Sequence, residues 1–79
     1  MPRSVRWLAA AWDQLQELPT EMFKDAQRVA GGLMADPCPQ DAEPDPEIPD
    51  TFIIRTKLIV LFYRLSADEI DIAGVWPDS

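Results

Sequence analysis

The chain has 79 residues, enough for a single domain over residues 1–79 whose core removes only about 60–65% of the unfolded surface from water. Its only cysteine is Cys38 and it has no histidine, which excludes an intrachain disulfide and a ligand set for zinc or iron, so we expect no cofactor. Seven Lys or Arg against fourteen Asp or Glu give a net charge of −7, which opposes nucleic-acid binding by the chain as a whole.

Hydropathy and the start of the chain bear on its location. No stretch approaches the roughly 20 apolar residues that a membrane span requires. In the opening residues, MPRSVRWLAAAWDQ, charge comes too early for a secretory leader. The sequence therefore predicts a cytoplasmic protein with no membrane partner.

The N-terminal part predicts a short strand and then a helix. SVRW, residues 4–7, combines a β-branched and an aromatic residue, as strands do. The following segment has apolar residues at helical spacing and polar residues on its other side. The apolar set is Leu8, Ala11, Trp12, Leu15 and Leu18. Leu18-Pro19 ends this helix, because a residue before proline is disfavoured in the helical region.

A second helix is predicted over about residues 21–35, with Thr20 as its N-cap. Its apolar face consists of Met22, Ala26, Val29 and Leu33, with Phe23, Ala30 and Met34 beside them. Gly31 and Gly32 each cost a helix about 1 kcal/mol relative to alanine. They either permit close backbone packing, which we favour, or mark a frayed end.

Residues 36–50, DPCPQDAEPDPEIPD, hold six acids, no base and five of the eight prolines. Proline removes backbone donors, so we expect an extended loop without a regular element. The loop is either a solvated connector or a segment that lies across a basic surface of this molecule or of a partner. A further alternative is that it mimics nucleic acid or shields Arg55 and Arg64.

The C-terminal part predicts a three-stranded antiparallel meander. TFIIR, residues 51–55, is β-branched and aromatic, and Thr56-Lys57 is short enough for a tight turn into LIVLFYRL, residues 58–65. A second turn at residues 66–68 leads into EIDIAGVW, residues 69–76, whose side chains alternate between two faces.

Alternation assigns the strand residues to two faces. If Ile70 and Ile72 face the helices, the same face carries Phe52, Ile54, Ile59, Leu61, Tyr63 and Leu65. The opposite face carries Ile53, Arg55, Val60, Phe62, Arg64, Asp71, Ala73 and Val75. This second face is too apolar for water, and exposed apolar patches commonly mark interaction sites.

Val60 and Phe62 on this second face need a cover, unless the central strand is simply hydrophobic. The candidates are the acidic loop, a second copy of the protein in a homodimer, or a partner segment. Trp76 is either a core or rim aromatic or a platform for base stacking. Arg55, Lys57 and Arg64 form a small basic group that either makes structural salt bridges, with Asp71 in reach of one of them, or faces a phosphate.

Several short motifs accompany this order of elements: ELP at residues 17–19, LMADP at residues 33–37, Arg55 eight residues before Tyr63, and FYR followed by a short turn and EIDI. Together they resemble the RelE/ParE superfamily of bacterial toxins from type II toxin-antitoxin pairs. The resemblance spans nearly the whole chain. It implies an α+β fold of β-α-α-β-β-β order, with a two-helix hairpin on one face of a small antiparallel sheet and a functional surface on the other.

For relatives that cut messenger RNA on the ribosome, the resemblance implies a surface of arginines, lysines and a tyrosine. Attack by the ribose 2′-hydroxyl needs proton transfer and stabilisation of negative charge. Arg55 matches a basic family position, and Tyr63 matches the usual strand tyrosine, although its parity turns it to the core. Val60 replaces the third-strand arginine, and the chain ends VWPDS without a basic tail. Whether the chain is an enzyme therefore stays open.

The resulting hypothesis is a toxin that acts on the ribosome and its messenger RNA, or on DNA gyrase, and is neutralised by a cognate antitoxin. If it cleaves RNA, Arg55 and Arg64 stabilise charge and Lys57 positions a phosphate. The residues expected to bind a partner are Ile53, Lys57, Val60, Phe62 and Trp76. The alternative is a non-catalytic protein-binding module on the same scaffold.

Overall fold

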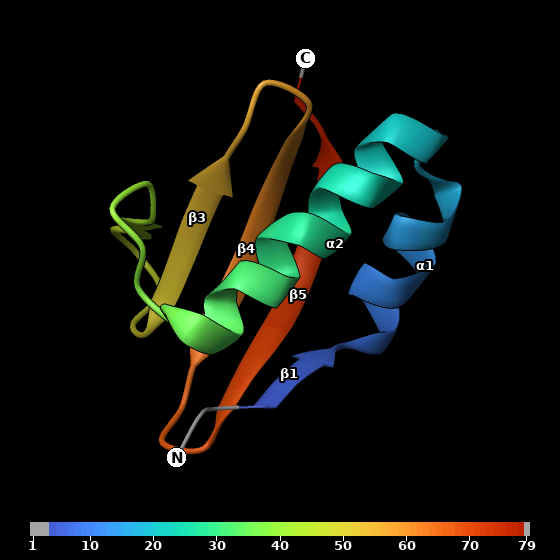
Figure 1. Cartoon of the computed structure of the whole chain (residues 1–79). Coiled ribbons are helices and arrows are strands. Elements are labelled where there is room, and N and C mark those ends of the chain that lie inside the picture. Colours follow the sequence, from blue (N-terminus) through green and yellow to red (C-terminus); the bar gives the residue numbers. More distant parts are fainter. Residues whose placement is uncertain (1–3, 79) are drawn as a thin grey trace.

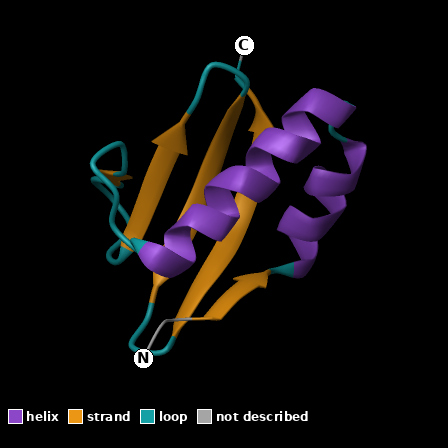
Figure 2. Cartoon of the chain, viewed as in Figure 1, coloured by secondary structure: helices purple, strands orange, loops and turns teal. Residues whose placement is uncertain are grey.

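The computed structural model describes residues 4–78, in which two helices lie on one face of a five-stranded sheet (Figure 1, Figure 2). The elements are β1 (Ser4–Trp7), α1 (Ala9–Glu17), α2 (Thr20–Ala35), β2 (Glu43–Pro44), β3 (Thr51–Arg55), β4 (Ile59–Leu65) and β5 (Glu69–Pro77). The strand order in the sheet is β1-β5-β4-β3-β2. Within the described residues, neither helix is both long and apolar enough to cross a membrane.

The predicted α+β fold, with its helical hairpin and its β3-β4-β5 meander, is confirmed. The sheet is mixed rather than purely antiparallel, because β1 runs parallel to β5. A parallel pair needs a long crossover connection, and here both helices and the β3-β4 hairpin lie between the two strands in the sequence. The last strand of the chain therefore lies inside the sheet, between β1 and β4.

The prediction that the acidic loop contains no regular element is wrong at Glu43–Pro44. These two residues form β2, which pairs antiparallel with β3 at the edge of the sheet. Proline is tolerated in an edge strand, since its missing N–H costs no hydrogen bond on the solvent side. In Figure 1 this segment lies beside β3, at the side of the sheet opposite β1.

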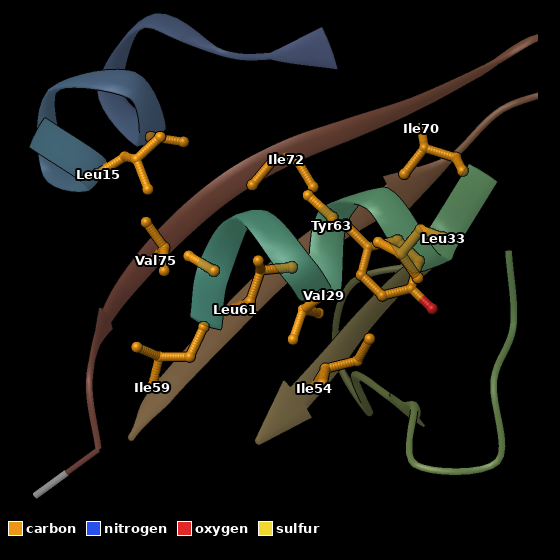
Figure 3. Close-up of a cluster of buried hydrophobic side chains, with 13 residues drawn as sticks. Leu15, Val29, Leu33, Ile54, Ile59, Leu61, Tyr63, Ile70, Ile72 and Val75 are labelled. Carbon is orange, nitrogen blue, oxygen red and sulfur yellow. The ribbon is translucent and has the colours of Figure 1, made fainter. Parts of the chain in front are cut away.

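The core lies between the helices and the near face of the sheet, where the labelled side chains of both layers converge (Figure 3). Ile54, Ile59, Leu61, Tyr63, Ile70 and Ile72 all lie in this core, as the alternation predicts. From the helices it receives Ala11, Leu15, Ala26, Val29, Ala30 and Leu33. Phe52 and Leu65 are half-buried and pack against it.

Three details of the predicted helices are wrong. Trp12 and Met34 are 45% and 48% exposed, because Ala11 with Leu15 and Ala30 with Leu33 already turn the buried stripes toward the sheet. Thr20 is the first helical residue rather than the cap, and Pro19 before it offers no side-chain hydrogen bond. The amide of Phe23 is instead bonded to the Pro19 carbonyl at 2.9 Å.

Gly31 and Gly32 neither pack closely nor mark fraying. Helix α2 continues to Ala35, both glycines are exposed, and an added Cβ would meet no atom within 4 Å at either position. The favoured packing interpretation is therefore wrong. Helix α2 is therefore less stable than it would be with alanine at these two positions.

Replacing Gly31 by alanine is expected to raise the free energy of unfolding by about 0.5–1 kcal/mol, because alanine loses less backbone freedom on folding. Gly32→Ala is expected to act in the same direction. Urea unfolding followed by far-ultraviolet circular dichroism measures the change. Gly74→Ala is the matched control, since a Cβ there would lie 2.7 Å from Trp76 Cζ3, and it is expected to destabilise. Destabilisation by Gly31→Ala would contradict the open environment of this helix face.

Candidate binding face of the sheet

The face of the sheet away from the helices, the open face, has an apolar centre. Strand pairing places Ile53 opposite Phe62, and Val60 between Arg55 and Trp76. We name Ile53, Val60, Phe62 and Trp76 the apolar patch. Val60 is only 5% exposed yet lies outside the core cluster, as expected for a side chain on the far side of the sheet between two long neighbours.

A β-bulge changes the predicted parity at the end of β5. Tyr63 pairs with Ile72 and Phe62 with Gly74, so that Ala73 is left without a partner on β4. The extra residue shifts the alternation by one. Val75, predicted on the open face, is therefore fully buried in the core. Trp76 stands on the open face opposite Val60 and is 39% exposed, so it is a rim aromatic rather than a core residue.

The bulge brings two aromatic rings together. The rings of Phe62 and Trp76 are 4.7 Å apart between centroids and inclined at 44°. Gly74 lies beneath this pair, and the indole occupies the space that a Cβ at Gly74 would need. A glycine within a strand pattern is a sequence signal for a bulge or a close approach, and Gly74 is the signal from which this site could have been predicted.

The negative charge of Asp71, at one end of the open face, is neutralised by Arg6, a residue that the sequence analysis did not single out. Arg6 Nε donates to Asp71 Oδ1 at 3.1 Å, and Arg6 Nη2 lies 3.3 Å from Glu69 Oε2. The hydrogen bond and charge of Asp71, and then the charge of Glu69, raise the pKa of Arg6. Asp71 therefore pairs with Arg6 of β1, not with Arg55, Lys57 or Arg64. Only the parallel β1-β5 register reveals this contact.

Arg55 and Arg64 lie at opposite ends of the β3-β4 hairpin. Arg64 pairs with Thr51, which precedes Arg55 by four residues along β3. At about 3.4 Å per residue, the two arginine backbones are about 14 Å apart along the strands. Among residues 4–78, neither arginine makes an ion pair. The two cations thus frame the apolar patch from its ends rather than forming one compact anion site.

Solved structures that share this fold include RelE toxins, alone and in complex with RelB. A structure of the toxin-antitoxin complex RelBE2 from Mycobacterium tuberculosis superimposes with a TM-score of 0.85 at 26% identity, covering 99% of this chain and 100% of that chain. The chain shares the RelE fold and is RelE/ParE-like. The isolated RelE toxin of Escherichia coli matches at a TM-score of 0.83 with 11% identity, over 98% of this chain and 85% of that one.

Similarity of this RelE/ParE-like chain also extends to an archaeal protein. The RelE-RelB complex from Pyrococcus horikoshii matches with a TM-score of 0.79 and 19% identity, over 98% of this chain and 96% of that chain. Neither a protein-family model nor a curated protein sequence matches the chain. The likeness is therefore carried mainly by three-dimensional structure.

Tyr63 of this RelE/ParE-like chain is a structural residue. Its ring is fully buried, as its parity predicts, and stacks on Phe52 with centroids 5.6 Å apart. Its hydroxyl donates a hydrogen bond of 2.9 Å to the carbonyl of Pro37. Burial, the main cause, raises the pKa of Tyr63 well above its ordinary value of 10. Tyr63 is thus unsuited to proton transfer at the surface.

Lys57 is exposed in the β3-β4 turn, and this turn is tied to α2. Thr56 Oγ1 donates to Asp25 Oδ2 at 2.6 Å and accepts hydrogen bonds from the amides of Leu58 and Ile59. Arg28 Nη2 lies 2.7 Å from Asp25 Oδ1. Burial acts to raise the pKa of Asp25, but the bonds from Thr56 and Arg28 outweigh it, so this pKa lies below its ordinary value of 3.8.

Replacing Asp25 by asparagine is expected to lower the free energy of unfolding by about 1–2 kcal/mol at pH 7, because charge-assisted hydrogen bonds become neutral ones. A lowered folded-state pKa gives stability that is complete above the unfolded value and disappears as the pH falls through the folded value. Wild type and variant should therefore converge below pH 3.8. Urea unfolding between pH 7 and pH 2 measures this.

The matched control for Asp25→Asn is Asp13→Asn, at an exposed position of α1 without an ion pair in the described structure. It is expected to change stability by less than about 0.5 kcal/mol. A difference between wild type and Asp25→Asn that stays constant from pH 7 to pH 2 would argue against the charge-assisted contacts.

Proposed function

We propose that this chain is the toxin-like component of a type II toxin-antitoxin pair and that its protein partner is a cognate antitoxin. The observation that carries the proposal is the match over nearly the full length of both chains to a toxin-antitoxin complex at 26% identity. Matches to the RelE-RelB complexes of Escherichia coli and Pyrococcus horikoshii support the same role.

The open face is the proposed binding surface for the antitoxin. Binding interfaces concentrate their energy in a few aromatic and arginine anchors near the centre of an apolar patch, with a polar rim around them. The tilted pair of Phe62 and Trp76 provides such a centre, and Arg55 and Arg64 lie on its rim. A segment of the antitoxin, added as a strand or laid as a helix across the open face, would cover these rings.

The proposed action of the free protein is inhibition of translation at the ribosome or of DNA gyrase. If messenger RNA is cleaved, Arg55 and Arg64 would stabilise the developing charge and Lys57 would position a phosphate. Val60 stands where nuclease relatives have an arginine, and Tyr63 is buried. These two positions favour inhibition by binding over cleavage.

Expression in a bacterial host, with and without the product of the adjacent gene, tests the proposal. We expect the chain alone to arrest growth and the neighbour to restore it. Pulse labelling of protein synthesis and plasmid supercoiling then assign the target. Harmless expression, with unchanged translation and supercoiling, would contradict the toxin role.

A non-catalytic binding module on the same scaffold is the second candidate function. It is favoured by the separation of about 14 Å between Arg55 and Arg64 along the strands, since one scissile phosphate is best held by converging cations. Affinity capture and a ribosome cleavage assay distinguish the two. A stable partner other than the ribosome, gyrase or an antitoxin, with intact messenger RNA, would support the module and exclude the toxin.

A further inference from the structure

Residues 41–45, which we name the acidic segment, have a fixed position at the edge of the sheet. The Asp45 amide donates to the Thr51 carbonyl at 2.8 Å, and β2 pairs with β3 just before it. Ala42 packs against the core, and its amide donates to the Pro39 carbonyl at 2.9 Å. These contacts argue against a freely solvated connector.

The pairing of β2 with β3 brings acidic residues to the edge of the sheet near Arg55. Glu43 stands opposite Ile53, two residues before Arg55 on β3, and Asp41 lies in the turn that precedes β2. A depression of about 460 Å³ is lined by Gln40, Asp41, Glu43, Ile53 and Arg55. Asp41 also lines a second depression with Arg55 and Lys57. Acidic and basic side chains therefore share the same surface hollows.

Arg55 nevertheless keeps its hydrogen-bonding capacity. It is exposed and, among residues 4–78, makes no ion pair with Asp41, Glu43 or any other carboxylate. The acidic segment thus acts on Arg55 through the electrostatic potential of its carboxylates rather than through an ion pair. A negative charge about 8 Å from a phosphate in water weakens phosphate binding about twofold, and salt screens this effect.

We propose that the acidic segment is a built-in electrostatic shield of Arg55, which keeps the affinity of the open face for single-stranded RNA low as long as β2 stays paired with β3. The interacting charges are Asp41 and Glu43 on one side and Arg55, with the neighbouring Lys57, on the other. Displacement of the segment would expose this basic end of the face to a phosphate backbone. The inference does not depend on the proposed function, because it concerns binding by the purified chain alone.

The test measures binding of a fluorescent ten-nucleotide single-stranded RNA by anisotropy at about 20 mM salt. The double variant Asp41→Asn/Glu43→Gln preserves side-chain size and backbone pairing. It is expected to bind about three- to sixfold more tightly than wild type, and the gain should vanish near 500 mM salt. Introducing Arg55→Gln into the double variant should remove most of the gain, as a double-mutant cycle requires of coupled groups.

The matched control is Glu47→Gln/Asp68→Asn, which changes the net charge equally at two exposed positions outside the acidic segment. It is expected to tighten binding by less than about 1.5-fold. Equal gains in the two double variants would overturn the shield in favour of a general effect of net charge. Absence of measurable binding by Asp41→Asn/Glu43→Gln, or a gain that survives Arg55→Gln, would overturn it as well.

Discussion

Replacing Phe62 by serine is expected to weaken binding of the proposed antitoxin by about 100-fold or more, while the domain stays folded. Phe62 lies at the centre of the apolar patch, against the ring of Trp76 and opposite Ile53. Loss of a central aromatic anchor costs a binding interface about 2–4 kcal/mol, and 2.7 kcal/mol corresponds to a factor of about 100. Stability should fall less than affinity, because Phe62 lies outside the core cluster.

Titration calorimetry with the product of the adjacent gene measures the affinity of the Phe62→Ser variant. Trp12→Ser is the matched control, since Trp12 is an exposed aromatic on α1, away from the open face. It should leave the affinity within about twofold of wild type. An equal loss in both variants, or an unchanged affinity of Phe62→Ser, would contradict the open face as the antitoxin site.

Replacing the adjacent Leu61 by alanine is expected to have the opposite effect: a large loss of stability with little change in antitoxin affinity. Leu61 is fully buried among the helix and sheet residues of the core (Figure 3). Truncation of a buried leucine costs about 2–5 kcal/mol, through lost burial and the cavity that remains. In a chain of this size, the melting temperature should fall by about 4–8 °C for each kcal/mol.

Differential scanning calorimetry and urea unfolding measure the effect of Leu61→Ala. The control is Leu58→Ala, because Leu58 lies in the β3-β4 turn and is 38% exposed. It should cost less than about 1 kcal/mol. Antitoxin affinity of the Leu61→Ala variant, measured below its melting temperature, should stay close to that of wild type. If Leu61→Ala had a mild effect on stability and Phe62→Ser a severe one, the assignment of the two faces of β4 would be wrong.

Local patterns in the sequence predicted β1, β3, β4 and β5 but not β2, and they predicted the side of β3, β4 and β5 that faces the helices, up to Ile72. Tyr63 was placed in the core by alternation alone, against its expected surface role in nuclease relatives. The alternation then failed at Val75 and Trp76, because one unpaired residue, Ala73, exchanges the two faces. Gly74 was the only local signal of this change.

Contacts between distant segments could not be predicted in the same way. The parallel register of β1 with β5 brings Arg6 to Asp71, and no local pattern encodes that pairing. The same applies to Gln14, whose side-chain oxygen accepts a hydrogen bond of 3.0 Å from the amide of Val75. Ile53, Val60 and Phe62 of the apolar patch were thus readable from sequence, as were its cations, whereas the face of Trp76 and the neutralisation of Asp71 were not.

The strand order also governs when this molecule acquires its structure during synthesis. Ser4 is paired with Glu69, so that β1 lacks its partner strand until residues 69–77 have been made. Closing such a distant contact is slow, and the apolar stripes of both helices stay without their main cover meanwhile. Residues 69–77 must therefore leave the ribosome before the sheet can close, so that the open face is completed only after its last strand has been synthesised.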